Sequence, residues 1–94
     1  MAYILVRHKV KDYEKWKPAF DEHETTRKDS GSKGGRLFRN TEDPNEIVVI
    51  FEWDNLENAR KFATSEDLKN IMQQAGVIGK PDISFLEEVE RVKM

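Results

Sequence analysis

The chain contains no cysteine among its 94 residues. Disulfide bonds, thiolate nucleophiles and cysteine-based zinc sites are therefore excluded. Apolar residues are also scarce, because hydrophobic residues make up 37% of the chain and charged residues 36%. A short, polar chain has a marginal core, and burial against a second copy is a common remedy. The length predicts a single domain over residues 1–94.

Long hydrophobic runs and a strong charge of one sign are missing too. The N-terminal apolar run, residues 3–6, is too short for a secretory signal or a bilayer span. The net charge of -2 gives no general attraction to nucleic-acid phosphates. We therefore expect neither a nucleic-acid nor a membrane partner, and a cytoplasmic location.

The sequence also lacks the common cofactor and metal motifs. Gly34 and Gly35 precede a predicted strand rather than a helix, and no GxGxxG or GxxxxGK pattern surrounds them. The two histidines, His8 and His23, show no HxH or HxxxH spacing, so no metal site is expected. No serine has a recognisable nucleophile context. We predict no cofactor.

Hydrophobic pattern, caps and turns divide the chain into strands and helices. A helix is expected between a cap at Asp12 and a stop at Gly31, with a kink or a new start at Pro18. Residues 54–57 resemble a capping box that starts a helix to about Thr64, and a second cap at 64–67 begins the next helix. Strands are predicted over residues 3–10, 35–41, 46–53 and 82–92.

The resulting βαββαβ order is the ferredoxin-like plan, an α+β fold with a four-stranded antiparallel sheet and helices on one face. In residues 3–6 and 47–51 the apolar side chains do not alternate with polar ones. An antiparallel sheet with one wet face should alternate, so both faces of these strands are predicted to be buried. A second subunit would cover the free face, which predicts a homodimer through the sheet faces, a dimeric α/β barrel.

Three segments carry a family resemblance: YILVRHKVKDYEKWKPAFDEH, EIVVIFEWDNLENARKFATS and SFLEEVERV. Together they resemble the dimeric α/β barrel superfamily, in particular its small antibiotic biosynthesis monooxygenase-like proteins. That resemblance implies a pocket between sheet and helices in each subunit. It also implies a functionally mixed family of cofactor-free oxygenases, haem-degrading enzymes and proteins of unknown role. Trp53 matches loosely a tryptophan of the active branches, whereas the first strand lacks the asparagine that marks haem-degrading members.

Helical spacing predicts one stripe along the first helix, formed by Tyr13, Trp16, Phe20, His23 and Arg27. The stripe begins aromatic and ends polar. If it ends at a pocket, His23 is a candidate general base and Arg27 a candidate group for stabilising an anion. The alternative is that the helix passes from core to solvent, with Arg27 in surface ion pairs.

Further side chains are candidates for holding a flat aromatic ligand. Trp53 completes the candidate catalytic set with His23 and Arg27, and the candidate ligand-binding residues are His8, Trp16, Phe20 and Phe38. Strand parity does not decide whether His8 faces the helices or a partner subunit. Aromatic residues at such spacing also serve plain packing.

Three functions are compatible with these patterns. The first is a monooxygenase-like enzyme, free of cofactors, that acts on a small aromatic or quinol-type compound. The second is a protein that binds a small ligand without turnover. The third is a structural dimer whose pocket is filled by its own side chains.

Overall fold

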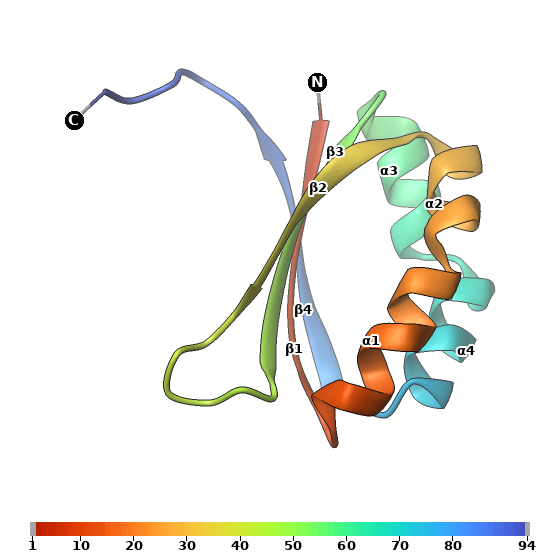
Figure 1. The fold of residues 1–94 in the computed structure, drawn as a ribbon. Coiled ribbons are helices and arrows are strands. Elements are labelled where there is room, and N and C mark those ends of the chain that lie inside the picture. The colour runs from red at the N-terminus through yellow and green to blue at the C-terminus, as the bar shows by residue number, and fades with distance from the viewer. Residues whose placement is uncertain (1, 94) are drawn as a thin grey trace.

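The structure, a computed structural model, describes residues 2–93 (Figure 1). That part of the chain forms eight elements: β1 (Ala2–Val10), α1 (Tyr13–Glu22), α2 (Glu24–Ser30), β2 (Ser32–Arg39), β3 (Glu46–Trp53), α3 (Leu56–Ala63), α4 (Glu66–Gln74) and β4 (Val77–Glu87). The strands form one antiparallel sheet in the order β2-β3-β1-β4, and the helices cover one of its faces (Figure 1). The predicted ferredoxin-like class is confirmed. In this described part, no helix is long and apolar enough to cross a membrane.

The sheet has one face buried under the helices and one that the helices leave uncovered. Ile4 of β1 and Ile47 of β3 lie on the buried face, with 1% and 0% of their surface exposed. Leu5 and Ile50, which pair with each other, lie on the uncovered face and are half-buried. Phe38 of β2 shares that face and is 45% exposed. The absence of alternation in β1 and β3 therefore corresponds to an apolar sheet face outside the core.

The first helical segment is interrupted at His23 rather than at Pro18. The carboxylate of Asp12 caps α1 by accepting a hydrogen bond from the backbone of Glu14. Pro18 lies inside α1, where it removes only the hydrogen bond to the carbonyl of Glu14. His23 leaves the helical conformation at φ -83° and ψ 0°, and α2 starts directly after it. The alternative of a new helix start at Pro18 was therefore wrong, because α1 runs through it from Tyr13 to Glu22.

The last strand begins five residues earlier than predicted. β4 runs from Val77 to Glu87 and contains Pro81, which was expected to precede it. β4 is an edge strand, and its register against β1 shifts between Arg7 and Lys9, so a residue without an N–H is tolerated there. The strand ends where its partner begins, at the pair Ala2 and Glu87.

The second predicted strand was also shifted, because it starts at Ser32 and ends at Arg39. A register irregularity between Ser32 and Gly34 lets it begin early, in agreement with a bulge near the glycines. The two later helices are confirmed. Asn55 caps α3 and Ser65 caps α4 through their side-chain oxygens.

The close approach of β2 to β3 requires glycine at position 35. A Cβ there would clash with the carbonyl oxygen of Ile50 and crowd the Cα of Phe51. We predict that Gly35→Ala lowers the free energy of unfolding by about 1–3 kcal/mol, as overpacking usually does. Urea denaturation measures this, with the exposed Lys33→Ala as the control. Equal stability of the two variants would contradict the strand contact.

Candidate active site

The polar end of the stripe on the first helical segment is buried. His23 is 7% exposed and Arg27 is 8% exposed. Trp16 and Phe20 precede them on the same side, with ring centroids 4.8 Å apart. The stripe thus passes from core to a pocket and not to solvent. The surface ion pairs of Arg27 that the alternative interpretation implied are not formed among the described residues.

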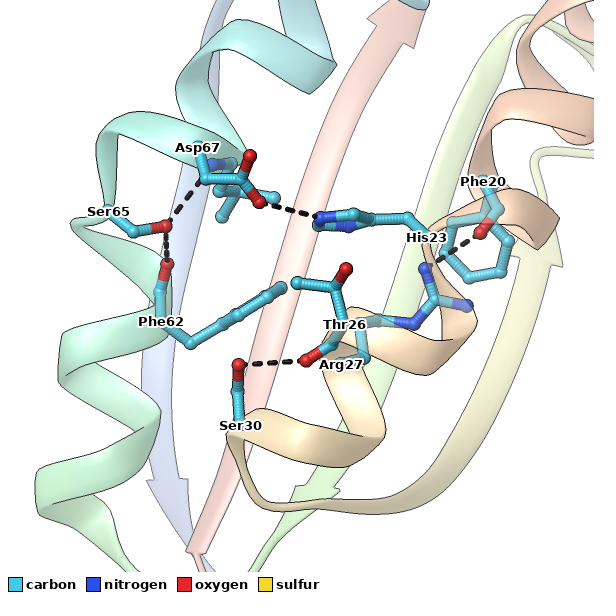
Figure 2. A network of polar contacts seen from close by, with 9 residues as sticks. Phe20, His23, Thr26, Arg27, Ser30, Phe62, Ser65 and Asp67 are labelled. Carbon is cyan, nitrogen blue, oxygen red and sulfur yellow. Dashed lines mark hydrogen bonds and ion pairs between the residues drawn. The ribbon is translucent and has the colours of Figure 1, made fainter.

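The helix break fixes the position of Arg27. Because α1 stops at Glu22, the carbonyl of Phe20 lies at its C-terminal end, and Nη1 of Arg27 donates a hydrogen bond to it at 2.8 Å (Figure 2). The guanidinium carbon lies 4.0 Å from the centre of the Phe20 ring and 5.6 Å from that of Phe51. A cation is favoured at a helix C-terminus and over aromatic faces.

Burial lowers the pKa of Arg27, and the nearby carboxylates of Glu24 and Asp21 partly offset this. The ordinary pKa of an arginine is so high that the side chain stays charged at neutral pH. The pocket therefore holds a buried positive charge that has no carboxylate partner among residues 2–93.

His23 is oriented by a carboxylate from another helix. Its Nε2 lies 3.2 Å from Oδ2 of Asp67, in the first turn of α4 (Figure 2). The side chain of Asp67 is 65% exposed, whereas that of His23 is 7% exposed. If Nε2 carries the proton and donates it to Asp67, the lone pair of the imidazole lies at Nδ1. This is the arrangement in which a carboxylate positions a histidine base.

His8 lies on the helix-covered face of β1, which settles the parity that the sequence left open. It is 6% exposed, and neither ring nitrogen has a hydrogen-bond partner among the described residues. Its ring lies 5.6 Å from that of Trp16. Burial lowers the pKa of His8 to about 4, so the imidazole is neutral at physiological pH.

Two neighbouring hollows that share lining residues surround these side chains. The inner pocket has a volume of about 50 Å³ and is lined by His8, His23 and Arg27 among otherwise apolar side chains. The outer cleft, between α2 and β2, has a volume of about 650 Å³. Both are lined by Phe20, Arg27, Val49 and Phe51. Because ligand sites usually measure about 300–1,000 Å³, the outer cleft can hold a ring and the inner pocket only a substituent.

Most of the predicted ligand-binding residues come together, but two candidate residues do not line these hollows. His8, Trp16 and Phe20 line the inner pocket with His23 and Arg27. Trp53 is fully buried, and its indole N–H donates to the carbonyl of Ser30 at 3.1 Å. It packs on Phe62, which lines the pocket, and so supports the wall from behind. Phe38 lies on the other face of the sheet, paired with Val48.

Sequence reasoning missed Asp67 and the outer cleft. Asp67 was interpreted only as part of a helix cap, and no spacing in the sequence links it to His23, 44 residues away. The cleft depends on Gly34 and Gly35, whose lack of side chains leaves the edge of β2 open beside α2. Among residues 2–93, no group of three or more histidine, cysteine, aspartate or glutamate side chains could hold a metal ion.

The lowered pKa of His8 makes the fold sensitive to acid. The unfolded chain takes up a proton on His8 near pH 6.5, and the folded chain does so only near pH 4. Between these two pH values protonation favours the unfolded chain. The unfolding free energy is therefore unaffected by His8 above pH 6.5 and decreases as the pH falls towards 4. We predict that His8 titrates near pH 4 in NMR spectra of the folded protein. The loss of unfolding free energy is at most about 3 kcal/mol. A midpoint near 6.5 would contradict the burial of this side chain.

The chain matches the antibiotic biosynthesis monooxygenase family over residues 2–74. No curated protein matches it. Among solved structures, the cofactor-independent oxygenase SnoaB from Streptomyces nogalater is similar, with a TM-score of 0.78 and 12% identity over 99% of this chain and 97% of that one. Rv0793 from Mycobacterium tuberculosis has a TM-score of 0.72 and 11% identity over 98% of each chain.

An antibiotic biosynthesis monooxygenase of 19% identity covers 96% of this chain and 100% of its own, with a TM-score of 0.71. At these identities the structural likeness shows the fold alone. The match to the family itself spans most of the sequence. The chain belongs to the antibiotic biosynthesis monooxygenase family.

Proposed function

We propose that the protein is a cofactor-free monooxygenase acting on a small, flat, weakly acidic hydroxylated aromatic compound. The observation that carries this proposal is the buried cation of Arg27, which faces both hollows without a carboxylate partner among the described residues. A buried charge of this kind stabilises an anionic ligand, because the surroundings are apolar and little water screens the interaction.

The charges of the outer cleft favour the same class of ligand. Lys28 and Lys33 line it together with Arg27, and Glu24 is its one carboxylate in the described part of the chain. The side chain of Arg36 points to the other face of the sheet by its pairing with Ile50, so its charge is not counted. The cleft is therefore positive in a chain whose net charge is -2, and it would attract and retain an anion.

His23 and Arg27 would carry the chemistry. His23, oriented by Asp67, removes the proton from the aromatic hydroxyl, and the guanidinium of Arg27 stabilises the resulting anion. The anion is electron-rich enough to be oxidised by dioxygen, which adds to a ring carbon that bears hydrogen. Loss of water then leaves a quinone. One oxygen atom enters the ring and the other leaves as water, and the substrate supplies all four electrons, so no separate reductant is needed.

The alternative function is binding of such a compound without turnover. The volume of the inner pocket, about 50 Å³, favours it, because little space beside His23 remains for a second reactant. Binding and turnover are separated by measuring both on the same compounds.

The uncovered sheet face supports a homodimer as part of the proposal. Leu5, Ile50 and Phe38 lie on it, and exposed apolar patches of this kind mark interaction surfaces. A second copy of the same face is its natural complement, which would bury these side chains and enlarge a small core. A cytoplasmic location remains a prediction.

Activity is tested by oxygen uptake and quinone formation with 1-naphthol and related naphthols. We predict that His23→Gln lowers turnover by about 10²-fold or more, since general base catalysis contributes on this scale. Asp67→Asn should lower it less, and Glu57→Gln, an exposed carboxylate on α3, should leave it unchanged. Full turnover in a folded His23→Gln protein would exclude the assigned base. Saturable binding without any product would establish the alternative.

Association is tested by light scattering coupled to size exclusion. We predict a dimer, and a monomer for Phe38→Glu, because a carboxylate cannot be buried unpaired between two sheets. Leu56→Glu is a matched control, since Leu56 is 44% exposed and lies at the start of α3. A monomeric native protein, or a dimer unaffected by Phe38→Glu, would contradict the interface.

A further inference from the structure

The inner pocket contains one polar group that the proposed chemistry does not use. His8 is more than nine-tenths buried, and both Nδ1 and Nε2 lack a hydrogen-bond partner in the described chain. Buried polar groups are normally satisfied, and leaving one unpaired destabilises the fold. Such an exception requires an explanation, and the location of His8 on the wall of the pocket offers one.

None of the described side chains packed around His8 is a hydrogen-bond partner for its ring nitrogens. Val6 and Val10 lie on the same side of β1, and Trp16 packs against the imidazole with a ring distance of 5.6 Å. The other polar side chains of the pocket make hydrogen bonds to groups other than His8, because Nε2 of His23 contacts Asp67 and Nη1 of Arg27 donates to the carbonyl of Phe20. A leucine or phenylalanine would satisfy the packing at position 8 without the cost of an unpaired imidazole.

The chemistry of the neutral imidazole defines the group it can receive. One ring nitrogen donates a hydrogen bond and the other accepts one. A hydroxyl group both donates and accepts, whereas a carboxylate only accepts and would be isolated in an apolar pocket. The pocket volume of about 50 Å³ suits a hydroxyl and the edge of the ring that bears it.

We propose that His8 is a positioning residue that holds a neutral hydroxyl group of the bound aromatic compound in the inner pocket. The rest of the ring lies in the outer cleft against Phe20 and Phe51, and its ionised oxygen lies near Arg27, which lines both hollows. The inference rests on the proposed function for the identity of the ligand, and it narrows the substrate to aromatic compounds with two oxygen groups on separate sides of the ring. His8 then selects the ligand and its orientation, while His23 acts as the base.

The test compares two ligands on three proteins without oxygen, so that binding is measured apart from turnover. The ligands are 1,4-dihydroxynaphthalene and 4-methoxy-1-naphthol, which lacks one of the two hydroxyl donors. We expect native protein to bind the dihydroxy compound at least tenfold more tightly in calorimetry. His8→Phe should bind both equally, and His8→Gln, which keeps a donor and an acceptor, should retain part of the preference.

Thermal unfolding of the ligand-free proteins provides a second readout that does not depend on the ligand. We expect His8→Phe to raise the melting temperature by about 4 °C or more, because it removes an unsatisfied buried group from a small domain. If His8 only stabilised the fold, His8→Phe would lower the melting temperature.

Equal affinity of native protein for both ligands, or no binding of the dihydroxy compound at millimolar concentration, would overturn the proposal. A lower melting temperature of His8→Phe would overturn it as well. Loss of turnover through failure of His23 as a base would leave the ligand preference intact. These measurements therefore distinguish a failure of the role proposed for His8 from a failure of the proposed function.

Discussion

The contact between the guanidinium of Arg27 and the carbonyl of Phe20 is the interaction on which the site depends. This hydrogen bond, 2.8 Å from Nη1 of Arg27 to the carbonyl oxygen of Phe20, links α2 to the C-terminal end of α1 across the break at His23. In a continuous helix this carbonyl would accept the backbone N–H of Glu24. At the break it instead accepts the backbone N–H of His23 at 3.3 Å and the guanidinium of Arg27. The interruption therefore creates both a partner for the cation and a backbone position from which His23 reaches Asp67.

A buried arginine of this kind is costly to the fold. Desolvation disfavours the charge. One hydrogen bond to protein, two aromatic faces and the nearby carboxylates of Glu24 and Asp21 compensate for it in part, and none of these carboxylates forms an ion pair with Arg27 among the described residues. His8 adds a second cost in the same pocket, because its nitrogens are unpaired. Two such exceptions side by side are typical of a binding site that a ligand completes, and they are difficult to explain as packing.

The sheet separates this site from the face proposed for association. Helix-covered side chains of β1 and β3 form the floor of the pocket, whereas the alternate side chains form the uncovered face. Through the two-residue period of a strand, the same two strands contribute to the pocket and to the face proposed for the dimer. A substitution such as Phe38→Glu can disturb association without entering the pocket, and His8→Phe can do the reverse.

Residue pattern predicted the antiparallel sheet, the helix caps and the polar end of the first stripe, because each depends on local spacing. The contact between His23 and Asp67 could not be predicted from residue pattern, because tertiary packing brings together two residues that are 44 positions apart. The start of β4 was missed because Pro81 was taken as a barrier, although an edge strand tolerates it. Phe38 was assigned to the pocket since aromatic type alone does not reveal which face of a strand it occupies.

Stabilisation of an aromatic hydroxyl anion by Arg27 can be measured with 4-nitrophenol, because its phenolate absorbs visible light. The absorbance of the bound probe would be followed against pH with native protein and with Arg27→Met. We expect binding to native protein to lower the pKa of the probe below its value in free solution, and we expect Arg27→Met to abolish this shift. An unchanged or raised pKa in native protein would contradict the claim.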